Sequence, residues 1–231
     1  MDRNFIEQLR KYQKRVDDWF NFRENRKGTE FNKEQNTVIK FVAPLFQILG
    51  WCPFSVNPAD MEFEYYIRDK STNRRRSVDI ALYSGTPPMP KFLVEIKPIQ
   101  DKDKIDRLGK TNLEKAASQL YKYYFKNSNV VYGIVTNGAE LKVYSKKFVT
   151  KKSGIARELF SLKYKDFVDY SDILSVLSKG KVEADEFDQL ARAYQTKQYA
   201  DWKKNSKIGN AEHDDYILPL EFAREFLRKK L

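Results

Sequence analysis

Apolar residues recur at steps of three and four near the start of the chain, which predicts two amphipathic helices. The first spans residues 1–27. The second begins at Thr29 or Asn32 and runs to Leu49, where Gly50 is typical of a helix end. Because Pro44 inside this helix has no N–H to donate, we expect a kink or a break near Phe41.

The pattern then changes to the alternation typical of strands. Met61–Arg68 alternates apolar and polar positions and predicts a strand. Two apolar segments, Val78–Tyr83 and Phe92–Ile96, are joined by Ser84–Lys91, a segment rich in proline and glycine. The simplest structure for that pattern is a β-hairpin.

A helix and two further strands follow the hairpin. Leu113–Phe125 has a helical period, Val130–Val135 is an apolar run typical of a buried strand, and Leu141–Tyr144 is a further short strand. A helix between two strands predicts a βαβ crossover, so we expect an α/β fold with a central mixed β-sheet flanked by helices.

The last part of the chain has the charged, amphipathic character of helices. We therefore divide the chain into an N-terminal helix at residues 1–28, a core at 29–160 and a C-terminal helical subdomain at 161–231. The helices expected in that subdomain are Ser171–Leu177, Ala184–Trp202 and Leu218–Leu231.

The composition of the 231-residue chain excludes several kinds of chemistry. Cys52 is the only cysteine, so a disulfide framework and a thiolate zinc site are excluded. His213 is the only histidine; a solvated linker position is favoured for it, and no G-x-S-x-G motif supports a serine nucleophile partnered with it. The sequence has no apolar segment long enough for a membrane span and no signal-peptide core, so we expect a cytoplasmic protein with no membrane partner.

The charge of the chain favours an anionic partner. Its formal net charge is +11 at pH 7, and nucleic acid is the commonest partner for such a protein. Basic residues cluster at 74–76, 102–110 and 146–152, and each cluster fits either phosphate contacts or a solvated turn. The candidate nucleic-acid-binding residues are Arg74, Arg75, Arg76, Lys102, Lys104 and Tyr123.

Charged residues interrupt the two strands of the predicted hairpin. Glu95 and Lys97 project from the same face, about 7 Å apart along the strand, and Asp79 can lie across the hairpin from them. Two carboxylates beside a lysine suit a hard divalent cation such as Mg²⁺. The alternative is a solvated or edge strand, on which such charges are common. Glu34, near the start of the second helix, fits a helix cap or a side chain pointing into the metal site.

Six groups of short segments have an order that is typical of one group of enzymes: Glu34–Thr37 ahead of Pro44–Trp51, Asn57–Pro58 with Glu64–Tyr65, Arg76–Leu82, Val94–Lys97, Gln119–Tyr123, and Thr136–Gly138. With the order helix, three strands, helix and strand, they resemble the PD-(D/E)xK nuclease superfamily. The resemblance is closer to the N-terminal nuclease domain of type I restriction enzyme R subunits and to related stand-alone restriction endonucleases. It covers roughly residues 30–145. Val78 stands where the superfamily's name has proline, a departure that is frequent in the superfamily.

The resemblance implies a restriction-endonuclease-like core and a role for each matching residue. Asp79, Glu95 and the carbonyl of Ile96 would bind Mg²⁺, for which Mn²⁺ would substitute. Lys97 would orient or activate the attacking water and stabilise charge on the scissile phosphate. Glu34 would support the metal ligands or hold a second metal ion, and Gln119 would support the site.

We therefore expect a Mg²⁺-dependent DNA endonuclease that restricts foreign DNA, with other restriction-system subunits and a second copy of the chain as candidate partners. A repair nuclease or an RNA nuclease would use the same site. An alternative of another class is a catalytically silent nucleic-acid-binding or assembly module.

Overall fold

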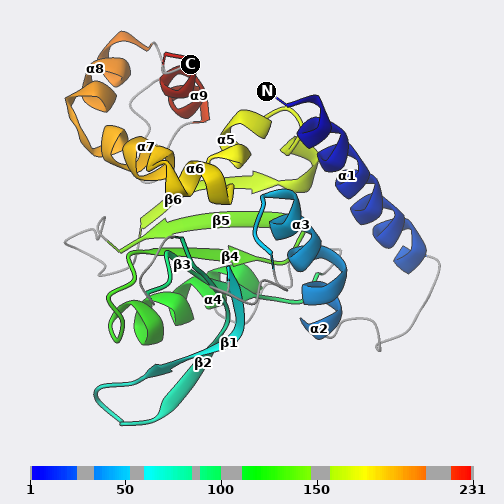
Figure 1. Cartoon of the computed structure of the whole chain (residues 1–231), viewed down its shortest axis with the longest axis vertical. Coiled ribbons are helices and arrows are strands. Elements are labelled where there is room, and N and C mark those ends of the chain that lie inside the picture. Colours follow the sequence, from blue (N-terminus) through cyan, green and yellow to red (C-terminus); the bar gives the residue numbers. More distant parts are fainter. Residues whose placement is uncertain are drawn as a thin grey trace.

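The fold is a mixed β-sheet with helices on both faces (Figure 1). The computed structural model describes residues 2–24, 34–52, 60–84, 89–99, 111–146, 157–206 and 220–229. Six strands form one sheet in the order β1-β2-β3-β4-β5-β6. They are β1 (Met61–Arg68), β2 (Arg75–Leu82), β3 (Phe92–Ile96), β4 (Tyr132–Thr136), β5 (Glu140–Ser145) and β6 (Arg157–Lys163).

All neighbouring strands are antiparallel except β3 and β4, which are parallel. A helical segment joins these two, consisting of α4 (Asn112–Gln119) and the π-helical η3 (Leu120–Phe125). Thr111 begins α4 with a capping box that includes Glu114. The prediction of an α/β fold with a mixed sheet, flanking helices and a βαβ crossover is therefore confirmed.

Each face of the sheet is covered by its own hydrophobic core. On one face, α4 and η3 pack on residues that include Ala81 and Leu93. On the other face, residues of the N-terminal and C-terminal helices surround Ile80, Val94 and Ile134. The α-helices with buried residues in this second core are α1 (Arg3–Glu24), α3 (Ala43–Ile48), α5 (Ser171–Ser175), α6 (Lys179–Glu183), α7 (Glu186–Gln195) and α9 (Leu220–Arg228). The short η4 (Tyr164–Asp166) and α8 (Lys197–Asn205) complete this part of the chain.

The predicted break near Phe41 is present as a π-helical segment. It is η2 (Val38–Val42), between α2 (Glu34–Thr37) and α3. Pro44 lies in the first turn of α3 and cannot donate to the carbonyl of Lys40, four residues earlier. Arg15 of α1 donates to that carbonyl instead, at 3.4 Å.

Sequence analysis missed β6, which pairs with β5. A bulge in this pair leaves Leu159 without a partner between Glu158 and Phe160. Leu159 and Phe160 are both buried, so the alternation that marks a strand is interrupted. β6 also spans the position, 160/161, at which the sequence suggested a boundary between core and helical subdomain.

Three other predicted boundaries were wrong. β2 begins at Arg75 rather than Val78, because Arg75 and Arg76 continue the pairing with β1. α6 occupies a segment predicted to separate two helices, and Lys179 at its start is held by Leu49 O, at 2.9 Å, and by Asp60. The predicted helix at 184–202 is two helices, since the extended backbone of Thr196 separates α7 from α8. In the described residues, no helix is both long and apolar enough to cross a membrane.

Gly138 fixes the turn between β4 and β5 against the N-terminal helices. Its φ is +84°, and a Cβ there would lie 2.5 Å from the Cβ of Phe41. Its carbonyl accepts a hydrogen bond from the hydroxyl of Tyr12, at 2.6 Å. Only glycine satisfies both the backbone conformation and the close approach of η2.

Replacing Gly138 by alanine is expected to lower the free energy of unfolding by at least about 1–2 kcal/mol, because of the left-handed backbone and the contact with Phe41. Urea unfolding measures the change. Gly180→Ala in α6 is the control, since nothing lies within 4 Å of a Cβ there. We expect it to stabilise the protein by about 0.4–1 kcal/mol. Equal effects of the two substitutions would contradict this role of Gly138.

Candidate functional site

The candidate site lies where β2 and β3 separate. Their ladder includes Ile80 opposite Val94 but no pair between Asp79 and Glu95, the next position. Instead, the Oδ2 atom of Asp79 accepts a hydrogen bond from the backbone N–H of Ile96, at 2.5 Å. The carboxylate therefore replaces a strand-to-strand hydrogen bond, and the strands diverge around it.

Glu95 and Lys97 lie at the same place, which we call the fork of β2 and β3. The Lys97 ammonium is 2.9 Å from Oε1 of Glu95, and the backbone N–H of Lys97 donates to Thr136 O on β4, at 3.0 Å. This hydrogen bond fixes the residue after β3 against the parallel strand. The structure thus brings Asp79, Glu95 and Lys97 together, as the strand pattern predicted.

Within the described ranges, one oxygen of Glu95 has no hydrogen-bond partner. Glu95 is only 5% exposed, and its Oε2 atom is buried without a donor in the described part of the chain. Leaving such an oxygen unpaired costs about 1–3 kcal/mol or more for a charged group. A cation bound between Glu95 and Asp79 would offset that cost, so the two carboxylates fit the metal that the sequence suggested.

Burial and like charge disfavour ionisation at the fork. Burial, followed by the charge of Glu95, raises the pKa of Asp79 to about 7. The pKa of Glu95 is also raised, by burial and to a smaller extent by Glu34, against the opposing effect of Lys97. Three carboxyl groups, those of Asp79, Glu95 and Glu34, face one ammonium, that of Lys97. That imbalance favours a divalent cation.

Lys97 keeps its proton in this environment. Burial lowers the pKa of its ammonium, but Glu95, Glu34 and Asp79 together outweigh that effect and the pKa is raised. The side chain is therefore a cation and a hydrogen-bond donor at neutral pH.

Glu34 opens α2 and lies on the wall of a cavity of about 900 Å³ that reaches Asp79. Its place in the first helical turn suits a carboxylate. One side chain therefore occupies the helix start and lines the same cavity as Asp79. The rest of the wall comes from the α2–α3 segment and β1, and includes Gln35, Val38, Ile39, Pro44, Gln47, Phe63 and Glu64.

Glu64, across β1–β2 from Asp79, was not expected to be unusual. Its φ is +55°, and the ladder omits the pair that Glu64 and Asp79 would make. β2 changes the face it presents at the same place: Val78 and Ile80, two residues apart, pack into different cores. Residues two apart normally share a face, so the two-stranded ribbon of β1 and β2 reverses the faces that it presents at Asp79. No pattern in the sequence marks this change.

The helix after β3 contributes a residue other than the one expected. Gln119 is exposed, and no hydrogen bond joins it to Asp79, Glu95 or Lys97. Tyr124 of η3 donates to Ser77 O at 2.6 Å instead. Burial, then the charges of Glu95 and Asp79, raise the pKa of Tyr124. Its place on the buried side of a predicted helix was the only signal for it.

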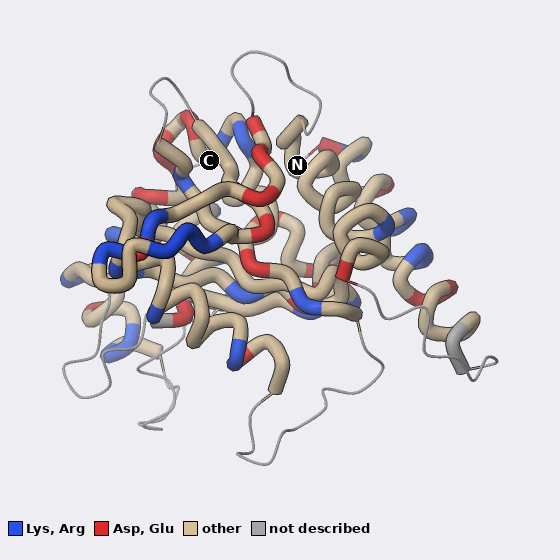
Figure 2. Tube along the Cα trace, turned by 90° about the horizontal axis from the view of Figure 1, so that it is seen from below, with Lys and Arg blue, Asp and Glu red and all other residues tan. Residues whose placement is uncertain are grey.

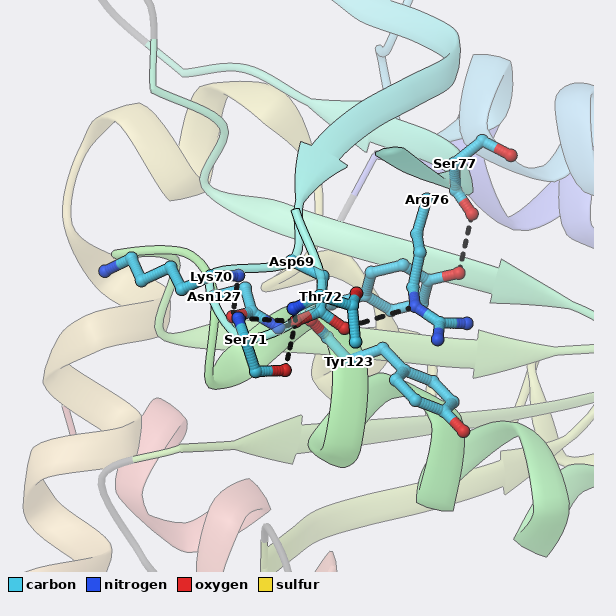
Figure 3. A network of polar contacts seen from close by, with 9 residues as sticks. Asp69, Lys70, Ser71, Thr72, Arg76, Ser77, Tyr123 and Asn127 are labelled. Carbon is cyan, nitrogen blue, oxygen red and sulfur yellow. Dashed lines mark hydrogen bonds and ion pairs between the residues drawn. The ribbon is translucent and has the colours of Figure 1, made fainter. Parts of the chain in front are cut away.

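Arg76 and Tyr123, two candidate nucleic-acid-binding residues, interact with each other. The Arg76 guanidinium lies 3.9 Å from the centre of the Tyr123 ring, and its Nε is 3.5 Å from Asp69 Oδ2 (Figure 3). This contact fastens the ribbon to η3. Arg74 and Arg75 are exposed, whereas Lys102, Lys104 and His213 lie outside the described residues.

Asp69 organises the turn between β1 and β2 (Figure 3). It accepts hydrogen bonds from the hydroxyl and backbone N–H of Ser71, at 2.6 and 2.9 Å, and from the N–H of Thr72, at 3.2 Å. These donors hold the pKa of its carboxyl well below the usual range. The same network includes Asn127, whose side-chain oxygen accepts from the N–H of Lys70 and whose amide nitrogen donates to the carbonyl of Tyr123.

A search of the described residues gives no group of three or more His, Cys, Asp and Glu side chains able to hold a metal. The fork holds two such side chains, those of Asp79 and Glu95. No family model, no curated protein and no solved structure matches the chain.

Removing the charge of Asp79 should stabilise the metal-free protein. In Asp79→Asn the amide oxygen still accepts from Ile96, and the repulsion from Glu95 disappears, so we expect a gain of roughly 1–2 kcal/mol. Mn²⁺ should raise the Tm of the wild type but not of this variant. The control Asp188→Asn, which weakens the ion pair with Lys91, should keep the response. An unchanged wild-type Tm with Mn²⁺ would contradict the metal site.

The turn around Asp69 predicts a pH-dependent stability. Because the folded pKa is below the unfolded value of about 3.8, the contribution of Asp69 is present above pH ~4 and is lost as the pH falls further. The Tm difference between wild type and Asp69→Ala should therefore shrink from pH 6 towards pH 3. Asp201→Ala, at an exposed position, should change Tm little throughout. A difference that is constant with pH would refute the assignment.

Proposed function

We propose that this protein is a metal-dependent endonuclease that hydrolyses phosphodiester bonds in DNA. What supports the proposal most is the fork itself. Asp79 and Glu95 lie there beside the Lys97 ammonium, and one buried oxygen of Glu95 has no donor among the described residues. The proposal includes a restriction-endonuclease-like core of the PD-(D/E)xK superfamily and a role in restriction of foreign DNA. Mg²⁺, with Mn²⁺ as a substitute, is the proposed cofactor.

Each residue at the fork has a chemical task in this proposal. Asp79, Glu95 and the Ile96 carbonyl would hold the cation, which supplies Lewis acidity and lowers the pKa of water when bound. Lys97, a cation at neutral pH, would donate a hydrogen bond to the scissile phosphate and stabilise its growing negative charge. A charged ammonium does not accept a proton, so Lys97 orients and stabilises rather than acting as the base.

The cavity lined by Glu34 and Asp79 gives the substrate access to the Asp79 side of the fork. Its wall carries Glu34 and the apolar side chains of Ile39 and Phe63, which are 70% and 42% exposed. Apolar walls limit water around the reacting groups and strengthen their electrostatic effects. Glu34 would support the metal ligands or hold a second metal ion from this wall.

The test is cleavage of plasmid DNA, single-stranded DNA and RNA with Mg²⁺ or Mn²⁺. Asp79→Ala and Lys97→Ala should each reduce the rate by roughly 10²–10³-fold or more, since the first removes a proposed ligand of the cation and the second removes a cation that stabilises developing negative charge. Lys91→Ala is a matched control: it also breaks a partly buried ion pair, with Asp188, at the other end of β3. It should keep wild-type activity once folding is verified by circular dichroism.

Cleavage that survives both substitutions would overturn the proposal. Absence of cleavage on every substrate, together with tight and salt-dependent binding, would instead favour a nucleic-acid-binding module. Cleavage of RNA alone would change the proposed substrate from DNA to RNA and leave the proposed site unchanged.

A further inference from the structure

The end of the β1–β2 ribbon carries exposed positive charge. In Figure 1 the ribbon extends away from the rest of the molecule. We call its outer part the distal ribbon, residues 65–78 with the turn between the strands. Lys and Arg positions are spread over the whole molecule in Figure 2, and a continuous run of them marks this end. The exposed basic residues of the distal ribbon are Arg68, Lys70, Arg74 and Arg75.

Arg68 and Arg75 lie directly opposite each other in the ladder. Like charges at a directly opposed cross-strand pair are destabilising. Neither side chain forms an ion pair or a hydrogen bond with any residue in the described ranges, in contrast to Arg76, which is engaged by Asp69 and Tyr123. The ribbon therefore carries a repulsion that an anionic partner would relieve.

The strand alternation places this pair on the side away from η3. Ile67 and Val78 pack into the core of α4 and η3, and Arg76 contacts Tyr123 of η3. The adjacent residues on each strand point the other way, and four of them are exposed. They form the ribbon face, which consists of Tyr66, Arg68, Arg75 and Ser77.

The ribbon face continues from the cavity of the candidate site. Phe63, Glu64 and Asp79 line the cavity against the α2–α3 segment, on the side of the sheet opposite α4. Arg75 precedes Asp79 by four residues, a distance of about 13 Å along the strand and of about four base-pair steps along a DNA duplex. Tyr66, between the arginine pair and the cavity, is 58% exposed.

We propose that the ribbon face binds the phosphodiester backbone of double-stranded DNA next to the cavity at Asp79, an inference that rests on the proposed nuclease function. Exposed arginines suit phosphate oxygens, to which they donate in a bidentate manner. A two-stranded ribbon also has the width of the DNA major groove. Arg76 is excluded from this role because its side chain holds the ribbon on η3.

The test is binding of a short labelled DNA duplex in EDTA, followed by fluorescence anisotropy between about 50 and 200 mM salt. We expect Arg68→Ala with Arg75→Ala to raise Kd roughly tenfold and to reduce the slope of log Kd against log salt by about 2. The control, Arg3→Ala with Arg10→Ala, removes the same charge from exposed positions on α1 and should change Kd less than about twofold.

A second variant separates loss of binding from loss of folding. Arg75→Glu places opposite charges across the ladder from Arg68, so it should raise Tm by about 1–4 °C while it weakens DNA binding at least as much as the double alanine variant. Either result, a lower Tm or an affinity equal to that of the wild type, would contradict the proposal.

Two outcomes would overturn the inference: wild-type affinity and salt slope in the double alanine variant, or polyglutamate binding as tightly as the duplex. The proposed function fails separately. If the wild type cuts no DNA and the ribbon variants still lose affinity, the ribbon assignment is supported without the nuclease. If the wild type cuts DNA and the ribbon variants bind normally, the nuclease stands and the ribbon assignment is refuted.

Discussion

Two neighbouring strands can separate within a sheet only where another group satisfies the backbone groups that they leave unpaired. At the fork of β2 and β3 that group is the Asp79 carboxylate, which accepts from the N–H of Ile96. The same carboxylate faces Glu95 in a largely buried environment, where its negative charge is disfavoured. One hydrogen bond thus shapes the sheet and brings Asp79 and Glu95 together. The repulsion between these two carboxylates destabilises the fold at the place where a bound cation would neutralise them.

The rest of the molecule holds the two sides of the fork differently. The β3 side is fixed, since Lys97 continues the hydrogen bonding to β4 and both faces of the sheet are covered there. The β2 side passes into a ribbon that is fastened to η3 by Arg76 and by the Tyr124–Ser77 hydrogen bond. Glu95 on the fixed strand β3 and Asp79 on the more peripheral strand β2 therefore come together at the fork. This arrangement suits a substrate that enters from the side of the ribbon.

Much of this could be predicted from the sequence, because the relevant patterns are local. The period of two in the strands places Glu95 and Lys97 on one face, and the hairpin brings Asp79 to them. Non-local features were not predictable. The bulge at Leu159 concealed β6, and the turnover at Glu64 and Asp79 leaves no trace in the alternation. The roles of Arg76 and Tyr123 depend on how far the ribbon lies from η3, which no spacing records.

The identity of the helical residue beside the fork shows a further limit. The resemblance to the nuclease superfamily implied a role for Gln119, and the sequence predicted one continuous helix over Leu113–Phe125. Residues after Gln119 are π-helical instead. The wider turn changes which side chains point to the sheet, and Tyr124 is the one that reaches Ser77. Mg²⁺ binding, a second copy of the chain and other subunits stay predictions.

The two π-helical segments, η2 and η3, also set a limit on changes in chain length. Each contains one residue more than an α-helical turn requires. Val38 and Ile39 of η2 line the cavity, and Tyr124 of η3 donates to Ser77 O near the fork. Deleting one residue from η3 would restore a regular helix and rotate the side chains after it by about 100°, which would take Tyr124 away from Ser77. These segments should therefore accept substitutions far more readily than insertions or deletions, although neither contributes a proposed metal ligand.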